Sequence, residues 1–210
     1  MFVRDHMTSN PITIAKDMSV LDALELMRQH NIRRLPVTNG GKLLGLVTEQ
    51  DLQKVSPSPA STLSVFEMNY LISKMAVKDV MNKQPATVDP DTPIEEAARI
   101  MRDEKKNELL VVTENQLLGI ISQTDLFEAL IRMFGFRRPG IRITLEVEDQ
   151  VGVLANVTKI VKDAQINIIS IANRQAEAGQ IEVVLRLSTS DSAAITQKFE
   201  AAGYVIRHID

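Results

Sequence analysis

Two stretches of the chain place a glycine, a hydroxyl residue and an aspartate at the same spacing. The first is Gly45-Leu46-Val47-Thr48-Glu49-Gln50-Asp51, and 74 residues later the chain reads Gly119-Ile120-Ile121-Ser122-Gln123-Thr124-Asp125. Each reads as a buried strand that becomes a helix at the hydroxyl residue, so Thr48 and Ser122 are natural N-caps. Free backbone N–H groups and the positive end of a helix dipole gather at such a point. Both stretches therefore predict a seat for a phosphate group.

The same residues also support a purely structural interpretation. In a capping box, a Thr or Ser caps the helix while an acid three residues later bonds back to the N–H of the cap. Thr48 with Asp51, and Ser122 with Asp125, both fit this pattern. The two stretches alone leave both interpretations open.

Both stretches belong to a longer repeat. Residues 3–52 align with residues 77–126 without a gap. Identical residues occur at Val3/Val77, Asp5/Asp79, Met7/Met81, Pro11/Pro85, Thr13/Thr87, Asp17/Asp91, Ala23/Ala97, Met27/Met101, Arg28/Arg102, Leu35/Leu109 and Val37/Val111. A constant offset over this length indicates a duplicated unit.

The sequence pattern of each unit predicts the element order β-α-β-β-α. In the first copy, an extended piece at residues 11–14 precedes a helix whose apolar positions recur at helical spacing from Val20. Two strands, at residues 35–38 and 43–47, flank the turn Asn39-Gly40-Gly41. One such unit leaves a sheet face uncovered, and a second unit would cover it.

Prolines help to place the boundaries. Thr92-Pro93-Ile94-Glu95 predicts a helix with Thr92 as its cap. The stretch Ser56-Pro57-Ser58-Pro59-Ala60-Ser61 cannot continue a helix, and Phe136-Arg137-Arg138-Pro139-Gly140 marks a second boundary. Between the repeats, apolar residues at helical spacing predict an amphipathic linker helix: Val65, Met68, Leu71, Ile72 and Met75.

The period of the sequence changes in the last third of the chain. From Ile141 to Val147 apolar and polar residues alternate, which is typical of a half-buried strand. The following segments predict a helix over 154–164, strands over 166–173 and 181–187, a helix over 192–202 and a strand over 204–209. The order β-α-β-β-α-β is the split-βαβ pattern. The whole chain is therefore predicted to be of mixed α/β and α+β class.

Composition limits the functions to consider. Apolar residues make up 44% of the chain and aromatic residues 4%, so its cores must be aliphatic. The absence of cysteine excludes disulfides, thiolate catalysis and zinc–thiolate sites. The three histidines match no metal-ligand spacing and no phosphate-binding Gly-x-x-x-x-Gly-Lys loop occurs, so we predict neither a metal site nor an enzyme. No signal peptide or membrane-spanning run is evident, which predicts a cytoplasmic protein without a membrane partner.

Three motifs of the repeat carry a resemblance to a known family: Met7-x-x-x-Pro11-x-Thr13, Ile32-Arg33-Arg34-Leu35-Pro36-Val37 and Gly45-Leu46-Val47-Thr48-x-x-Asp51. They resemble cystathionine-β-synthase (CBS) domains, and the pair resembles a Bateman module. Through Asp149-Gln150-Val151-Gly152-Val153-Leu154 and Ile166-Asn167-Ile168, the C-terminal third resembles an ACT domain with a ferredoxin-like fold. The combination resembles the AcuB-type acetoin-utilisation regulatory proteins. It implies a CBS domain over 1–55, a linker over 56–76, a second CBS domain over 77–134, a linker over 135–140 and an ACT domain over 141–210.

Paired CBS units commonly bind an adenine nucleotide (AMP, ADP or ATP), so the resemblance implies such a ligand here. Asp51 would hold the ribose hydroxyls, Thr48 would meet phosphate and Arg34 would neutralise it. Thr13 and Ile14 would frame the base. The remaining candidates are Arg33 and Pro36 beside Arg34, and Thr87, Val88, Ser122 and Asp125 in the second copy.

The second copy departs from the first where charge matters. Glu108 stands at the position of Arg34, and a carboxylate repels phosphate in a desolvated cleft. We therefore expect the cleft that uses Arg34 to be the better anion site. Lys105 or Lys106 could compensate in the other cleft.

The ACT resemblance implies a second candidate site in the loop after the first strand of that domain. In ACT domains this loop, facing its copy across a dimer, often binds an amino acid or a similar small effector. Val151 replaces the proline usual before the glycine, and Gly152 could serve only a tight turn, so an effector site and a simple turn both stay open. The candidate residues are Asp149, Val151, Gly152, Val153, Leu154 and Asn167.

These features predict a non-catalytic regulatory protein that forms a homodimer, since edges of ACT sheets tend to pair across a two-fold axis. A bound nucleotide would shift the packing of the CBS pair against the ACT domain and so control a partner enzyme. The alternative is a partner-binding or nucleic-acid-binding module, or a regulatory subunit of an enzyme complex, that has no small ligand and uses Arg137-Arg138. The formal net charge of −3 gives no global footprint for nucleic acid.

Overall fold

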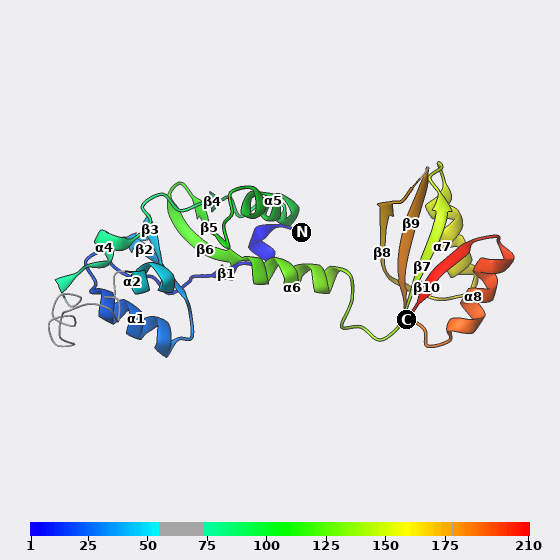
Figure 1. The fold of residues 1–210 in the computed structure, drawn as a ribbon, viewed down its shortest axis with the longest axis horizontal. Helices are drawn as coiled ribbons and strands as arrows, with labels where there is room; N and C mark the ends of the chain where they lie inside the picture. Colours follow the sequence, from blue (N-terminus) through cyan, green and yellow to red (C-terminus); the bar gives the residue numbers. More distant parts are fainter. Residues whose placement is uncertain (55–73, 178) are drawn as a thin grey trace. The chain divides into compact units, whose positions relative to one another are not determined.

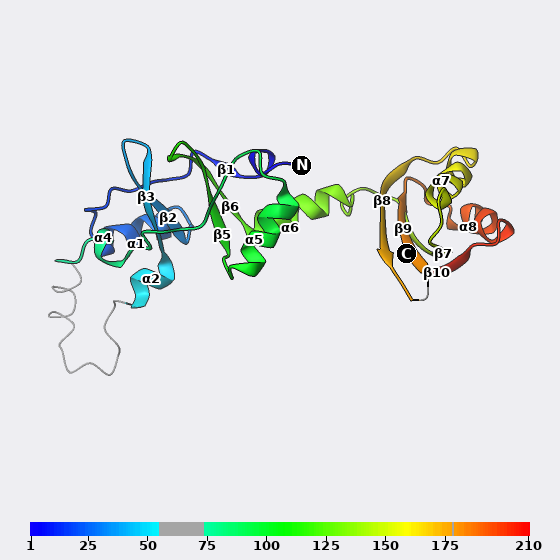
Figure 2. The same cartoon turned by 90° about the horizontal axis from the view of Figure 1, so that it is seen from above.

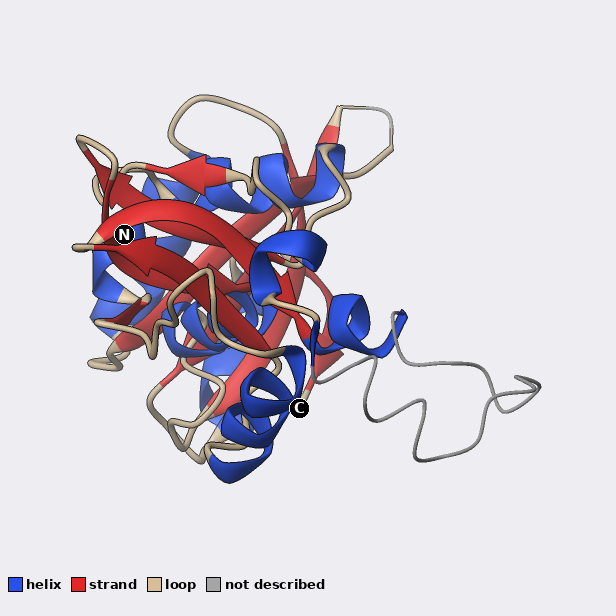
Figure 3. Cartoon of the chain, turned by 90° about the vertical axis from the view of Figure 1, so that its left-hand side faces the viewer, coloured by secondary structure: helices blue, strands red, loops and turns tan. Residues whose placement is uncertain are grey.

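The computed structural model describes residues 1–54, 74–177 and 179–210. They form two compact units, Met1–Leu126 and Phe127–Asp210 (Figure 1). Each unit contains both helices and strands, which Figure 3 distinguishes by colour along the chain. Of the predicted linker helix, Val65, Met68, Leu71 and Ile72 lie outside the described residues.

The first repeat follows the predicted order. Its first helix is capped by Ser19, whose Oγ accepts a hydrogen bond from the N–H of Asp22 at 3.1 Å. The extended piece predicted at residues 11–14 is reduced to a single parallel bridge between Ile14 and Val37. The elements are the 3-10 turn η1 (Val3–Asp5), β1 (Thr8–Ser9), α1 (Val20–Gln29), β2 (Arg34–Asn39), β3 (Lys42–Thr48) and α2 (Glu49–Lys54).

The second repeat has the same succession, with one difference in a helix cap. The predicted cap at Thr92 is wrong by one residue, because α5 begins at Ile94 and Pro93 is its N-cap. Pro93 has a ψ of 143°, which is extended and places it outside the helix. The elements are α4 (Val77–Val80), β4 (Thr87–Val88), α5 (Ile94–Asp103), β5 (Glu108–Thr113), β6 (Gln116–Ser122) and α6 (Gln123–Met133).

One sheet joins the two repeats, with the strand order β2-β3-β6-β5-β4 and β1 paired with β6. The two hairpins meet where β3 lies beside β6. The N–H of Leu43 donates to the carbonyl of Asn115 at 3.0 Å, and the N–H of Leu117 donates to the carbonyl of Gly41 at 3.1 Å. Leu43 and Gly41 in the first repeat correspond to Leu117 and Asn115 in the second, so each bond is the counterpart of the other. The two repeats are therefore related by an approximate two-fold axis.

The segment that leads into each repeat pairs with the other repeat. Thr8 in β1 lies opposite Ile120 in β6. At the equivalent place, Asn82 and Leu46 exchange two backbone hydrogen bonds of 2.9 Å. The leading segment of each repeat is therefore hydrogen-bonded to the second hairpin strand of the other repeat.

The C-terminal unit has the predicted β-α-β-β-α-β order and an antiparallel sheet with strand order β10-β7-β9-β8. Figures 1 and 2 both show α7 and α8 on the same face of this sheet, where Val157 and Phe199 are fully buried. The predicted fold class is thus confirmed. The elements are β7 (Ile141–Glu148), α7 (Val153–Asp163), β8 (Ile168–Gln175), β9 (Gln180–Leu187), α8 (Ser192–Ala201) and β10 (Val205–Ile209).

Candidate functional site

The glycines of the repeated stretches allow the other repeat to approach closely. A Cβ at Gly45 would lie 2.6 Å from the carbonyl oxygen of Asn82. A Cβ at Gly119 would lie 2.9 Å from the carbonyl oxygen of Thr8. Any side chain at these points would therefore push the two repeats apart. The glycine that opens each motif therefore allows the leading segment of the other repeat to lie close against that strand.

The aspartates of both stretches form capping boxes. Oδ2 of Asp51 accepts hydrogen bonds from the N–H of Thr48 at 3.1 Å and from its Oγ1 at 2.7 Å. Oδ2 of Asp125 accepts the equivalent two bonds from Ser122, both at 2.7 Å. The structural interpretation of these residues is therefore observed. It occupies one oxygen of each carboxylate, and Oδ1 of Asp51 lies 3.7 Å from Nζ of Lys54.

The larger of two clefts in the N-terminal unit takes its walls from both repeats and has a volume of about 550 Å³. The first repeat contributes the segments on either side of α1, including Arg33 and Arg34, and the second contributes the start of α6. Among the described residues, no carboxylate forms an ion pair with Arg33. The lining residues are Thr8, Asn10, Pro11, Ile12, Asn31, Ile32, Arg33, Arg34 and Pro36, together with Ile120, Ser122, Thr124 and Asp125.

The smaller cleft has a volume of about 280 Å³ and contains the other helix start. Thr48 lies there with two carboxylates, those of Glu49 and Glu108. Neither Lys105 nor Lys106 is among its lining residues, so neither supplies the suggested compensating charge there. The full lining is Arg33, Arg34, Thr48, Glu49, Gln50, Gln53, Asn107 and Glu108.

An ion pair lies between the repeats at the border of the two clefts. Nε of Arg34 is 2.5 Å from Oε2 of Glu108, and the side chains are 31% and 14% exposed. The two residues occupy equivalent positions of the duplicated unit. The Glu108 that replaces an arginine in the second copy therefore also neutralises part of the charge of Arg34.

The structure brings together only some of the candidate residues. Arg33, Arg34, Pro36, Ser122 and Asp125 line the larger cleft, and Thr48 lines the smaller one with the two arginines. The sequence interpretation placed Arg34 with Thr48 and Asp51 of its own copy, whereas the larger cleft pairs it with Ser122 and Asp125 of the other copy. Neither lining includes Asp51, Thr13, Ile14, Thr87 or Val88.

Two of those outlying residues serve the fold. Ile14 is 4% exposed and Val88 is 7% exposed, so both belong to the core. The N–H of Ile14 donates to the carbonyl of Pro36 at 3.0 Å, which fixes the segment beside β2. Thr13 and Thr87 are exposed.

Sequence reasoning missed part of the larger cleft. Thr8, Asn10 and Ile120 line it because the leading segment of the first repeat crosses to β6 of the second. The available signal was the glycine inside each predicted strand, since an interior strand glycine often marks the close approach of another backbone. The matched Met7 and Met81 lie in the crossing segments and point to the same contact.

A separate, small hollow of about 210 Å³ lies beside the loop after β7 in the C-terminal unit. It contains the predicted Asp149, Gly152, Val153 and Leu154, along with Asn173 of β8. Asn167 does not line it, and Val151 is fully exposed to solvent. Gly152 is the N-cap of α7 with a φ of 90°, a left-handed conformation that favours glycine.

Other candidate features have local explanations. Arg137 pairs with Glu128 at 2.8 Å, which neutralises part of the small basic spot before β7.

Among the residues that the structure describes, no group of three or more His, Cys, Asp or Glu side chains could hold a metal ion. Within the same residues, no helix combines the length and apolar character needed to cross a bilayer.

Comparison with known proteins agrees with this architecture. Residues 3–58 and 77–132 match the CBS domain and make up more than half of the chain. The chain belongs to the CBS-domain family. Residues 139–209 match the TTHA0829-like ACT domain, so the chain combines tandem CBS domains with a C-terminal ACT domain, as the sequence motifs predicted.

Similar proteins include two with solved structures and one enzyme. A Vibrio cholerae protein described as an acetoin utilization protein (AcuB) is 28% identical, with a TM-score of 0.55 over 65% of this chain and 95% of that one. CBSX2, solved in complex with AMP, is 30% identical, with a TM-score of 0.53 over 65% of this chain and 98% of that one. Inosine-5'-monophosphate dehydrogenase of Korarchaeum cryptofilum is 38% identical over 117 residues, which is 55% of this chain but only 21% of the dehydrogenase.

Proposed function

We propose that this protein is a non-catalytic regulator that binds an adenine nucleotide in the larger cleft of its CBS pair. The observation that carries the proposal is the composition of that cleft: Arg33 and Arg34 on one wall and Ser122 with Asp125 at the start of α6 on the other. Its volume of about 550 Å³ lies within the range of roughly 300–1,000 Å³ typical of small-molecule pockets.

Each part of a nucleotide has a matching group in this cleft. The two guanidinium groups and the positive end of the α6 dipole favour phosphate. Oδ2 of Asp125 is committed to Ser122, and its other oxygen would accept a hydrogen bond from a ribose hydroxyl. The side chains of Ile12, Ile32 and Pro36 would form an apolar surface for the base.

The known complex of a similar protein supports this assignment. CBSX2 is 30% identical to this chain over 65% of its length and was solved with AMP. The smaller cleft is the poorer candidate for an anion because Glu49 and Glu108 lie beside Thr48. We therefore expect one nucleotide for each CBS pair.

The protein would act through association. The strands β8 and β10 are the edges of the C-terminal sheet, and such edges tend to pair with a second copy. A homodimer is the expected state, and the nucleotide would change its activity toward a partner enzyme. Light scattering of the purified chain in solution tests the dimer.

The nucleotide site can be tested with a pair of matched variants. Asp51→Asn and Asp125→Asn remove the same capping carboxylate from equivalent positions, but only Asp125 lines the larger cleft. We expect titration calorimetry with AMP, ADP and ATP to show one site per chain. Asp125→Asn should weaken it about ten-fold or more, and Asp51→Asn should leave it nearly unchanged.

Two controls define the outcome. S-adenosylmethionine and NADH are titrated in parallel, because they share the adenosine part and differ in charge. If no adenosine compound binds, or if both variants weaken binding equally, the proposed site is wrong. Phosphate release from ATP above background, lost in Asp125→Asn, would instead indicate an enzyme.

A further inference from the structure

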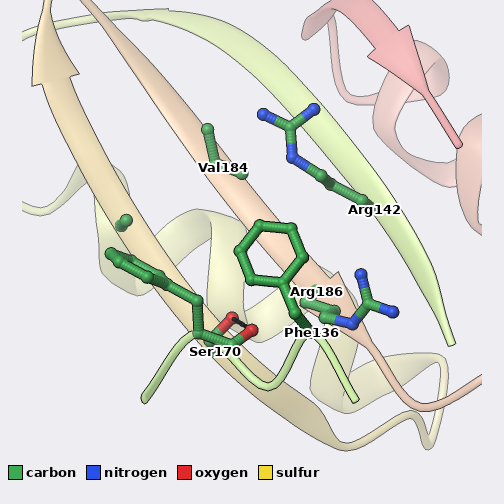
Figure 4. A pocket seen from close by; sticks show the side chains of 7 residues that line it. Phe136, Arg142, Ser170, Val184 and Arg186 are labelled. Atoms are coloured by element: carbon green, nitrogen blue, oxygen red, sulfur yellow. Dashed lines mark hydrogen bonds between the residues drawn. The ribbon is translucent and has the colours of Figure 1, made fainter. Parts of the chain in front are cut away.

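The sheet of the C-terminal unit has a hollow of about 220 Å³ that shares no residue with the clefts described above. Its walls come from β7, β8, β9 and the segment that follows α6 (Figure 4). The lining residues are Phe134, Phe136, Arg142, Ser170, Ala172, Val184 and Arg186.

The hollow lies on the face of the sheet opposite α7 and α8. Side chains alternate between the two faces of a strand. Ile143 and Leu185 belong to the core under the helices, so Arg142, Val184 and Arg186 point to the other face. This face would be open sheet surface without the segment from Phe134 onward.

That segment is fixed against the sheet. Oγ of Ser170 donates to the carbonyl of Phe134 at 2.9 Å, and Nη2 of Arg186 donates to the carbonyl of Arg138 at 2.9 Å. A Cβ at Gly135 would clash with the side chain of Ile169, so the chain passes there as closely as a glycine permits. The aromatic wall of the hollow is therefore preformed, which lowers the entropic cost of binding.

The hollow carries positive charge that is only partly compensated. Arg142 and Arg186 lie directly opposite each other on β7 and β9, and like charges in such a pair repel. Arg142 has only a 3.5 Å contact with Asp210, whose side chain is 58% exposed. Nε of Arg186 is buried without a hydrogen-bond partner, while its guanidinium lies 5.7 Å from the ring centre of Phe136.

We propose that this hollow binds a small carboxylate that has an aromatic or branched apolar tail and no ammonium group. The carboxylate would relieve the repulsion between Arg142 and Arg186 by accepting charged hydrogen bonds from their guanidinium groups. The tail would lie against Phe134, Phe136 and Val184. None of the described lining residues is acidic, so an ammonium group would face two arginines without a partner. Arylalkanoic, 2-oxo and 2-hydroxy acids fit this chemistry better than amino acids.

Three probes with the same ring and a similar chain length separate these requirements. 3-Phenylpropionate has the carboxylate, 3-phenylpropanol lacks it, and L-phenylalanine adds an ammonium group. Titration of the full chain by calorimetry should show saturable binding of 3-phenylpropionate. Binding of each of the other two should be at least about ten-fold weaker. 3-Phenylpropanol loses a charged hydrogen bond, and the ammonium group of L-phenylalanine is repelled by the two arginines.

Variants locate the binding in this hollow. Arg186→Gln and Arg142→Gln should each weaken 3-phenylpropionate about ten- to a hundred-fold. Arg174→Gln is the matched control, because Arg174 projects from β8, pairs with Glu182 at 2.6 Å and does not line the hollow. Arg142→Gln should also leave the thermal stability of the free protein unchanged or higher, since it removes a like charge beside Arg186.

The proposal is overturned if 3-phenylpropionate does not bind at millimolar concentration, or if 3-phenylpropanol or L-phenylalanine binds as tightly. It is also overturned if both arginine variants, shown to be folded by circular dichroism, retain the wild-type affinity. None of these results depends on nucleotide binding, so the two proposed sites stand or fall separately.

Discussion

Exchanging the charges of Arg34 and Glu108 tests how the two repeats are joined and whether Arg34 belongs to the proposed anion site. The single variants Arg34→Glu and Glu108→Arg each place like charges at the centre of the pair. The double variant restores opposite charges but removes the arginine from the larger cleft, because position 34 lines that cleft and position 108 does not.

The expected size follows from the burial of the pair. Opposite charges about 4 Å apart attract by about 4 kcal/mol at an effective dielectric constant of 20. Arg34 is 31% exposed and Glu108 is 14% exposed, so desolvation and solvent screening cancel much of this attraction. We expect each single variant to lose about 1–3 kcal/mol of stability and the double variant to recover about 1–2 kcal/mol.

Urea unfolding followed by circular dichroism measures the loss of stability of the whole chain. Hydrogen exchange of peptides from the N-terminal unit then assigns the loss to that unit. The matched control is the exchange of Arg174 and Glu182, a pair within the C-terminal unit whose arginine is 69% exposed. If the double variant loses the sum of the two single losses, the repeats are not joined through this pair. If the double variant binds AMP as tightly as the wild type, Arg34 is no part of the anion site.

Three further predictions concern the stability of the two units. Gly45→Ala should lower the free energy of unfolding by about 1–3 kcal/mol, because its Cβ would lie 2.6 Å from the carbonyl oxygen of Asn82. An unchanged midpoint of urea unfolding would show that the segment around Asn82 moves aside without cost. Phe199→Ala, at a fully buried position, should cost about 3–5 kcal/mol and lower the melting temperature of the C-terminal unit, whereas a small change would mean that the core collapses around the gap. The hydrogen bond from Lys78 lowers the pKa of Asp17 below 3.8, so a stability difference between wild type and Lys78→Gln should be present at neutral pH and vanish as pH falls through that lowered pKa. A difference that persists below that pH would show that the pair is not its cause.

Local signals in the sequence were enough to predict most of the helices and strands that the structure describes. The turn Asn39-Gly40-Gly41 is an example: Gly40 and Gly41 have φ values of 56° and 81°, as a tight hairpin with two left-handed residues requires. The missed cap at Thr92 was also a local decision. Pro93 fits both the cap position and the first helical position, since its φ of −58° suits either one.

The parts that sequence could not supply depend on contacts between the repeats. Alignment shows that Arg34 and Glu108 are equivalent, but only the two-fold arrangement makes them meet. In the same way, nothing local to Ser122 or Asp125 indicates that they share a cleft with Arg34. A duplicated sequence fixes which residues correspond, while long-range pairing decides which of them face each other. The domain boundaries at 55 and 134 stay predictions.

The crossing of the leading segments has a consequence for regulation. Because the larger cleft takes walls from both repeats, a ligand bound there would contact Arg34 of one and Asp125 of the other, and its affinity would depend on how the repeats are spaced. By linkage, any partner that altered this spacing would change the affinity for the proposed nucleotide by the same factor by which the nucleotide would change the affinity for the partner. Gly45 and Gly119 set the closest approach of the repeats, so a side chain at either position should weaken both interactions together. A protein that bound its nucleotide within one repeat alone would have no such coupling.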